Sequence, residues 1–367
     1  MHLRLAVAGI LAFTASAHAG PMIGVKVYET RRDPAGLFDE WRSLGINTVF
    51  ASVALNQDPS FREHARRTGI ARFVILPVFF DPDALEADPD LYASTARGER
   101  AVEEWVEFAC PTRAAYRQKK IDFVRRLMRE ADPDGISLDF IRHFVFWEKV
   151  YPDRPPESLP QTCFDTSCLA AFEKASGIKV PVEAKTTAEK AAWILATHGD
   201  RWTRWRCDVI TQTVAELSAA AREIQPRIKI NLHAVPWRRE DFGGGIRRIA
   251  GQDFAALARH VDYLSPMTYH HMVKRPADWV HAVTRELAEQ VQIPVVPSIQ
   301  VGKAYVENAL STEEVLSALH ESLKPPSAGV VFWSWQALED EPEKKAAVAK
   351  VFAVPPAAET TVAPHRP

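Results

Sequence analysis

The feature that most constrains the fold is an alternation of short apolar runs and amphipathic segments along nearly the whole chain. The runs are rich in β-branched and aromatic residues, which favours buried strands, and they lie at 22–28, 46–53, 71–80, 135–142, 227–235, 262–269, 293–301 and 328–335. The segments between them, such as 34–45 and 115–131, carry apolar residues at helical spacing. Strands that alternate with helices predict a parallel sheet covered by helices.

Eight strand and helix units in a chain of 367 residues are typical of a (β/α)8 barrel, also called a TIM barrel. The competing architecture is an open doubly wound sheet, which often carries a GxGxxG motif after its first strand. No such motif follows residues 22–28. We therefore predict one (β/α)8 barrel over residues 20–353 and no cofactor.

Two stretches fall outside the alternation. Residues 144–185 follow the fourth strand and contain aromatic residues, several prolines and two cysteines. In a barrel this connection lies on the catalytic face, so we expect a long insertion that folds into the wall of a cleft. Residues 354–367 are rich in Pro and Ala without periodicity, which predicts a disordered tail.

The amino terminus has the pattern of a secretory signal. Arg4 precedes an apolar stretch from Leu5 to Phe13, and the small residues Ala17 and Ala19 end it. We predict that residues 1–19 are removed and that the protein is exported to the periplasm or the exterior. No other stretch is apolar for long enough to cross a bilayer, so no integral membrane segment is expected after signal removal.

The charge of the chain is nearly balanced. Lys and Arg total 45 against 47 Asp and Glu, a net charge of −2. This balance offers no electrostatic surface for nucleic acid, so a neutral partner is expected.

The four cysteines become candidates for disulfides in an exported protein. Cys163 and Cys168 flank the short stretch CFDTSC and form the expected pair, which leaves Cys110 and Cys207 as a second bridge or as free thiols. A zinc site is the alternative. The spacing lacks a second close cysteine pair, so we predict no metal.

The stretch DGISLDFIRH, residues 134–143, carries the strongest candidate for chemistry. Ile136 and Leu138 alternate with Ser137 and Asp139 at the period of a strand, so Asp139 faces away from the apolar side near the carboxyl end of the strand. A (β/α)8 barrel places its reactive groups at these strand ends.

Polar and aromatic residues also gather at the ends of the other strands. Besides Ser52 and Asp81, the candidates that we expect to bind substrate are Tyr28, Glu29, Arg142, His143, His233, Trp237, Met267, Tyr269, His270, Trp333 and Trp335. Aromatic rings stack on the C–H faces of sugars, while carboxyl groups act on the glycosidic oxygen. The predicted partner is therefore a carbohydrate.

The motif around Asp139 resembles the fourth strand of glycoside-hydrolase-like barrels, whose pattern runs DGI-x-LDYIRYP. It is also similar to the fourth strand of α-amylases, and that resemblance implies that Asp139 is a nucleophile. The stretches MTY and GVVFW resemble the sixth and eighth strands of family 18 chitinases, which places Met267, Tyr269 and Trp333 on a sugar-binding floor.

The match to chitinases has a clear departure. Ser137 and Ile141 stand where a family 18 chitinase would carry an inner Asp and its catalytic Glu. Substrate-assisted chitinase chemistry is therefore not expected.

A glycosidase usually needs two carboxyl groups: a nucleophile or base, for which we predict Asp139, and a second group that protonates the leaving oxygen. The loop after the fifth strand, NLHAVPWRRED, offers Glu240 or Asp241 as this general acid, with a pKa raised by burial beside Trp237. Glu29 and Asp81 are the reserve candidates. The alternative for Glu240 and Asp241 is a solvated cluster with the neighbouring arginines, and the alternative for Asp139 is an ion pair with Arg142 or Lys26.

Two other functions remain open at this point. A non-catalytic glycan-binding barrel would keep the aromatic residues and lack the acid. A metal-dependent amidohydrolase barrel would carry an H-x-H pair on the first strand, where this chain reads GVKVYE. We predict a glycoside hydrolase, with the binding barrel as the alternative.

Overall fold

The structure is a computed structural model that describes residues 20–30 and 32–352. The predicted signal peptide at 1–19 and the predicted tail at 354–367 lie outside the described residues. No helix of the described part is long and apolar enough to cross a membrane.

Eight parallel strands form one sheet in the order β8-β7-β6-β3-β2-β1-β10-β9 within the described residues. Their bounds are β1 Met22–Val27, β2 Thr48–Ala51, β3 Ala71–Pro77, β6 Gly135–Asp139, β7 Lys229–Ala234, β8 Tyr263–Pro266, β9 Ser298–Gln300 and β10 Gly329–Trp333. Parallel bridges from Leu264 to Val295 and from Met267 to Ser298 join β8 to the β9 segment and close the barrel. The predicted (β/α)8 barrel is confirmed.

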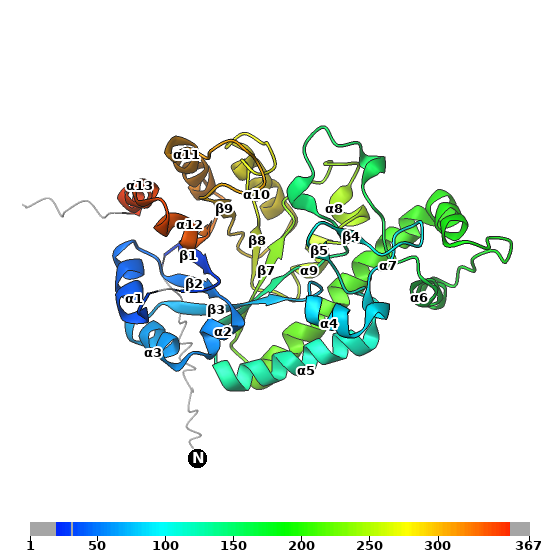
Figure 1. The fold of residues 1–367 in the computed structure, drawn as a ribbon, viewed down its shortest axis with the longest axis horizontal. Coiled ribbons are helices and arrows are strands. Elements are labelled where there is room, and N and C mark those ends of the chain that lie inside the picture. The colour runs from blue at the N-terminus through cyan, green and yellow to red at the C-terminus, as the bar shows by residue number, and fades with distance from the viewer. Residues whose placement is uncertain (1–19, 31, 353–367) are drawn as a thin grey trace, which may run out of the picture.

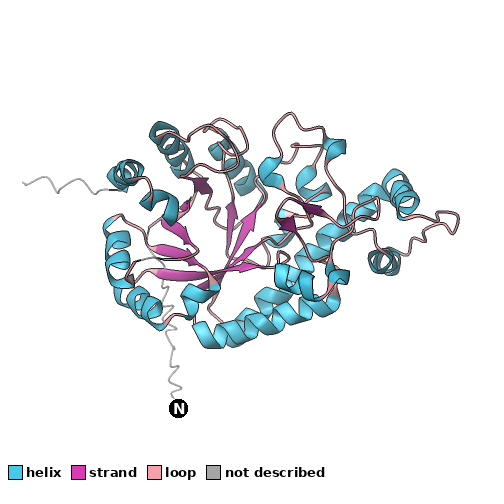
Figure 2. Cartoon of the chain, viewed as in Figure 1, coloured by secondary structure: helices cyan, strands magenta, loops and turns pink. Residues whose placement is uncertain are grey.

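Helices surround the strands on the outside of the barrel (Figure 1, Figure 2). The longer ones are α1 Pro34–Ser43, α3 Pro59–Thr68, α5 Ala114–Ala131, α7 Thr187–Ile224, α10 Trp279–Gln290, α11 Thr312–Leu323 and α13 Pro342–Phe352. Short helices are α2 Val53–Gln57, α8 Gly245–Arg248, α9 Phe254–Leu257 and α12 Trp335–Glu339. The amphipathic segments predicted at 34–45 and 115–131 correspond to α1 and α5.

The interior of the barrel combines an apolar layer with a polar one. Phe50 and Phe73 pack at its base, and a Cβ on Gly135 would lie 2.3 Å from the Phe73 ring, so the strand needs glycine there. Above them Asn231 donates a hydrogen bond to Ser137 at 2.8 Å and accepts one from Ser265 at 2.8 Å. These satisfied polar groups explain why the inward face of β6 carries Ser137 below Asp139.

Two insertions interrupt the alternation. The long insertion predicted after the fourth strand, at 144–185, is present after β6 and spans residues 140–186. It contains α6 Thr166–Ser176, a helix that the sequence did not predict. An insertion after β3, residues 78–113, was not predicted and contains α4 Pro82–Ala87 and a hairpin of β4 Val102–Glu103 and β5 Val106–Glu107.

The two insertions pack on each other. The backbone N–H of Cys163 donates to Ser94 at 2.8 Å, and that of Ala96 donates to Gln161 at 3.1 Å. Together they form a continuous wall beside the barrel.

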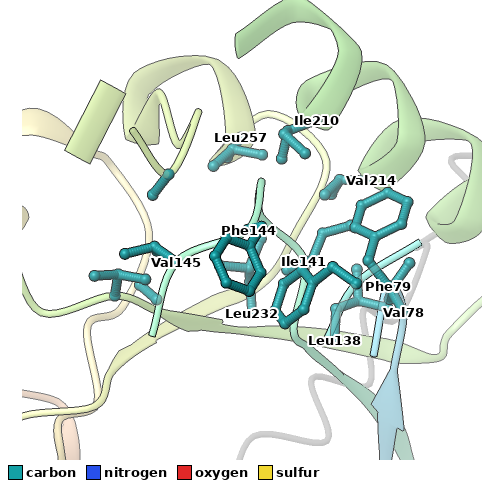
Figure 3. Close-up of a cluster of buried hydrophobic side chains, with 14 of the residues drawn as sticks. Val78, Phe79, Leu138, Ile141, Phe144, Val145, Ile210, Val214, Leu232 and Leu257 are labelled. Atoms are coloured by element: carbon teal, nitrogen blue, oxygen red, sulfur yellow. The ribbon is translucent and has the colours of Figure 1, made fainter. Parts of the chain in front are cut away.

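A buried apolar cluster anchors the start of the second insertion. Figure 3 shows Ile141, Phe144 and Val145, which follow β6, together with Ile210 and Val214 of α7. All of these side chains are buried. The segment that leaves β6 is therefore fixed by packing against a barrel helix rather than exposed as a free loop.

Candidate functional site

A cavity of about 520 Å³ opens at the carboxyl ends of the strands. Its floor comes from β1, β3, β6, β8 and β10, and the two insertions supply one wall. The residues that line it are Lys26, Tyr28, Ser52, Val53, Ala54, Ile75, Pro77, Trp105, Asp139, Phe140, Arg142, Glu148, Met267, Tyr269, Tyr305 and Trp333. Its size and position are typical of a small-molecule site in this fold.

Asp139 ends β6 at the floor of the cavity and is 6 % exposed. Its Oδ1 accepts a hydrogen bond from the backbone N–H of Phe140 at 2.8 Å. Phe140 has φ +49°, a left-handed conformation that a bulky residue rarely adopts, and such strain clusters at functional sites.

The charges around Asp139 favour its ionised form. Burial raises its pKa, but the positive charges of His233, Lys26 and Arg142, together with the Phe140 hydrogen bond, lower the pKa below its ordinary value. Burial, and then the charge of Lys26, lower the pKa of His233 to about 3. His233 is thus neutral near pH 7, and the cations that act on Asp139 there are Lys26 and Arg142.

Lys26 lies buried on β1 and donates a hydrogen bond to the Tyr269 hydroxyl at 3.1 Å. Burial lowers the pKa of Lys26 to about 8, and the charge of Asp139 opposes that effect. The ammonium is therefore still mostly protonated at neutral pH and can balance the carboxylate.

Glu148 supplies a second carboxyl group. It lies in the 3-10 turn Trp147–Lys149 of the second insertion, lines the cavity, and is 8 % exposed. Its Oε1 lies 3.8 Å from the Arg142 guanidinium, while its Oε2 accepts no hydrogen bond from the described residues. Burial raises the pKa of Glu148 to about 7, against the lowering effect of Arg142.

Aromatic rings form the rest of the wall. The rings of Tyr269 and Trp333 stack with centroids 4.4 Å apart at 18°. At the mouth, Trp105 of the hairpin is 43 % exposed and Tyr305 is 38 % exposed, and both rings contact Phe146 edge-on. Flat, partly exposed rings at the entrance suit a ligand with apolar faces.

The two carboxyl groups differ in protonation within one cavity. Asp139 is ionised and Glu148 holds its proton up to about pH 7, because one is surrounded by cations and the other is mainly desolvated. Titratable groups whose environments push their pKa values apart form an acid and base pair. One cavity therefore holds both a carboxyl group that can donate a proton and a carboxylate.

The structure brings six of the residues predicted from the sequence together around this cavity. They are Asp139, Tyr28, Arg142, Met267, Tyr269 and Trp333, and Ser52 joins them. Tyr28 is 43 % exposed as a whole residue, but desolvation of its hydroxyl inside the cavity, and then the charge of Asp139, raise its pKa.

Glu240 and Asp241 lie outside the cavity, on the loop after β7. Asp241 pairs with Arg275 at 3.2 Å and accepts from the backbone N–H of Arg238 at 2.9 Å. Trp237 packs on Phe242, with ring centroids 5.0 Å apart. The structure therefore places this loop away from Asp139.

The remaining predicted residues also lie outside the cavity lining. Glu29 is exposed, and Asp81 caps α4 and pairs with Lys120 at 2.8 Å. His143, His233 and His270 are buried, and Trp335 packs edge-on against Trp41 at 5.6 Å.

Sequence reasoning missed Glu148, Trp105 and Tyr305 and treated Lys26 only as a structural partner. One signal was present for Glu148. It is the sole acid in the apolar stretch FVFWEKV, residues 144–150, directly after the fourth strand. A lone carboxyl group within such a stretch is buried with its neighbours.

The cysteines group differently from the sequence prediction. The Cys110 sulfur lies 3.1 Å from that of Cys163 and 3.3 Å from that of Cys168, and all three are buried free thiols. These three are the candidate metal ligands among the described residues. Cys207 is not part of the group, and its sulfur contacts the Arg247 carbonyl at 3.7 Å.

Comparisons with known proteins support the fold. No protein-family model matches the sequence, and no curated protein matches it significantly. The structure is similar to the glycoside hydrolase domain of PgaB (BpsB) from Bordetella bronchiseptica, with a TM-score of 0.65 and 14% identity over 90% of this chain and 98% of that chain.

Two larger enzymes contain a similar barrel. Gan42B, a GH42 β-galactosidase from G. stearothermophilus, has a TM-score of 0.62 and 15% identity over 90% of this chain and 56% of that chain. The α-L-fucosidase isoenzyme 2 of Paenibacillus thiaminolyticus has a TM-score of 0.55 and 10% identity over 90% of this chain and 48% of that chain. This chain spans about half the length of both.

Proposed function

We propose that this protein is an exported glycoside hydrolase in which Asp139 and Glu148 are the two catalytic carboxyl groups. One observation carries the proposal: both carboxyl groups line a single aromatic-walled cavity, and their pKa values are shifted in opposite directions. The similar barrels of the PgaB glycoside hydrolase domain and of the GH42 β-galactosidase support a carbohydrate substrate.

In the proposed reaction Glu148 is the general acid. Its carboxyl proton passes to the glycosidic oxygen as the bond to the sugar breaks, and the leaving sugar departs as an alcohol. The raised pKa of Glu148 keeps this proton available near neutral pH.

Asp139 acts on the anomeric carbon from the other side. It either attacks that carbon as a nucleophile or accepts a proton from an attacking water molecule. Lys26 and Arg142 hold it ionised, and Lys26 acts as a positioning residue because it touches Tyr269 rather than a reacting atom. Determining the anomer released first by NMR distinguishes the two roles.

The signal at residues 1–19 places this activity outside the cytoplasm in our proposal. An exported barrel with a net charge of only −2 suits a poly- or oligosaccharide of the cell envelope or the surroundings. Mass analysis of the amino terminus of the exported protein tests the proposed cleavage.

The deciding experiment is release of sugar from a panel of bacterial and plant polysaccharides by the wild type and by Asp139→Asn. We expect turnover by the wild type and a loss of roughly a thousandfold or more in the variant, with the circular dichroism spectrum and glycan binding retained. Binding without turnover in both proteins would instead assign the chain to the non-catalytic glycan-binding barrels.

A further inference from the structure

Three thiols from the two insertions meet behind the wall of the cavity. Cys110 lies at the end of the first insertion, while Cys163 and Cys168 belong to the second. Their sulfurs all lie within 4.8 Å of one another, and each side chain is 0 % exposed. Thiolates arranged in this way are typical ligands for zinc.

His143 contacts this group through Cys163. Its Nδ1 lies 3.3 Å from the Cys163 sulfur, and its Nε2 lies 3.2 Å from the Arg206 carbonyl oxygen. A carbonyl can only accept, so Nε2 carries the hydrogen and Nδ1 keeps its lone pair toward the Cys163 sulfur. A histidine whose second nitrogen donates to a backbone carbonyl is the usual arrangement at metal sites.

The charge around the group also favours a metal. The Arg206 side chain is 0 % exposed, its guanidinium donates to the Arg248 and Ile249 carbonyls, and its charge interacts with Cys163 and Cys110. Among the described residues no carboxylate forms an ion pair with Arg206. Three thiolates, a neutral imidazole and Zn²⁺ carry one net negative charge, which is the counter-ion that a buried guanidinium needs.

We propose that Cys110, Cys163, Cys168 and His143 bind one zinc ion, which ties the two insertions together. The three thiols lose their protons to solvent when the metal binds. Zinc with sulfurs at about 2.3 Å sets them roughly 3.8 Å apart, so the present group opens slightly to admit the ion.

Polar side chains that are not themselves ligands lie next to the Cys168 sulfur. Thr112 lies 2.9 Å from the Cys168 sulfur and can donate to it. Asp165 lies 2.9 Å from the same sulfur, and its charge is balanced by Arg113 at 3.1 Å. Asp165 also caps α6, so it is already committed to other partners and is a poorer ligand than His143.

A disulfide is the competing arrangement. It would use two of the three sulfurs, leave the third as a buried thiol beside it, and leave Arg206 without an anion. A zinc ion would bind all three sulfurs and give Arg206 a negatively charged partner. This site does not depend on the proposed glycosidase activity.

The test is metal analysis of the full-length protein, purified without chelator from zinc-supplemented culture. We expect one zinc per chain, and cobalt substitution should produce intense sulfur-to-cobalt absorption in the near ultraviolet. Cys110→Ser and His143→Ala should lower the zinc content several-fold, whereas Cys207→Ser, a buried cysteine outside the group, should retain it.

A second measurement needs no variant. Removing zinc from the folded wild type with a chelator should expose three thiols to a thiol reagent that does not react before chelation. A protein that contains no zinc and a disulfide among these cysteines by non-reducing mass spectrometry would overturn the proposal, and so would unchanged zinc in a folded Cys110→Ser variant.

Discussion

The end of β6 and the insertion that follows it each deliver one carboxyl group to the same cavity, by different physical routes. Asp139 is positioned by the ladder of parallel strands, which pairs Asp139 with Pro77 of β3. Glu148 is positioned by packing of a loop whose aromatic neighbours fill the space between the barrel and the wall. Cations lie around the carboxyl group at the strand end, Asp139. The carboxyl group of the loop, Glu148, is mainly shielded from water.

This difference gives each group its chemistry. Asp139 stays ionised because Lys26 and Arg142 offset its burial. Glu148 is close to Arg142 as well, but at 3.8 Å and without a hydrogen bond to Oε2 the pair does not offset desolvation. Variants of the cavity residues can test whether Asp139 is ionised and Glu148 is protonated in the folded protein.

The largest effect is expected from Glu148→Gln. Removing a general acid should lower kcat by about 10²- to 10⁴-fold on natural glycosides. On a glycoside with a dinitrophenyl leaving group, which needs no proton, most of the activity should return, whereas Asp139→Asn should remain inactive on both. Rates on the two substrate classes measure this directly.

The matched control is Glu240→Gln, the acid predicted from sequence on the loop after β7. It lies outside the cavity, so its kcat should stay within about twofold of the wild type. Loss of activity in Glu240→Gln together with full activity in Glu148→Gln would contradict our assignment.

The second effect concerns stability against pH. The pKa of Glu148 rises from 4.5 to about 7 on folding, so the folded state holds the proton more tightly. The stability that this proton contributes is present below about pH 4.5 and is lost as pH rises through 7, a change of about 3 kcal/mol in unfolding free energy. Denaturant unfolding should show this loss between pH 5 and 8 for the wild type and not for Glu148→Gln. If the free energy of unfolding depended on pH in the same way in the wild type and in Glu148→Gln, Glu148 would be ionised in the folded state.

The third effect is a shift of the acidic limb of the pH profile. Lys26→Met removes a cation that lowers the pKa of Asp139, so the acidic fall in kcat/KM should begin at a higher pH than in the wild type. The control is Lys344→Met, which removes another buried lysine. Lys344 lies on the outer helix α13 and pairs with Glu341. An unmoved limb in Lys26→Met would mean that Asp139 does not depend on that charge.

The smallest effect is expected at the mouth of the cavity. Trp105→Ala and Tyr305→Ala remove half-exposed rings and should raise KM about three- to tenfold with little change in kcat. Trp193→Ala, on α7 and outside the cavity lining, should leave KM unchanged. A fall in kcat alone would indicate that these rings act on the reacting sugar rather than on the binding of its neighbours.

The fold was largely predictable because each strand and helix carries its own periodic pattern. Asp139, Met267, Tyr269 and Trp333 were found for the same reason: their places on strands fix their places in the barrel. Glu148 and Trp105 were missed because their positions arise from contacts between two insertions, and local sequence does not encode such contacts. Glu240 and Asp241 were chosen because an acid is expected after the fifth strand, but neither lines the cavity, and Asp241 forms an ion pair with Arg275.

The way in which the barrel closes gives its two sides different resistance to local opening. Strands β3 and β6 share five paired positions, up to Pro77 and Asp139, whereas β8 reaches the β9 segment through the isolated bridges Leu264–Val295 and Met267–Ser298. Amide hydrogens at the contact between β8 and the β9 segment should exchange with solvent faster than those of β6. In the proposed glycosidase, a sugar ring on Met267 would meet a surface that can adapt to different ring substituents, while Asp139 stays fixed.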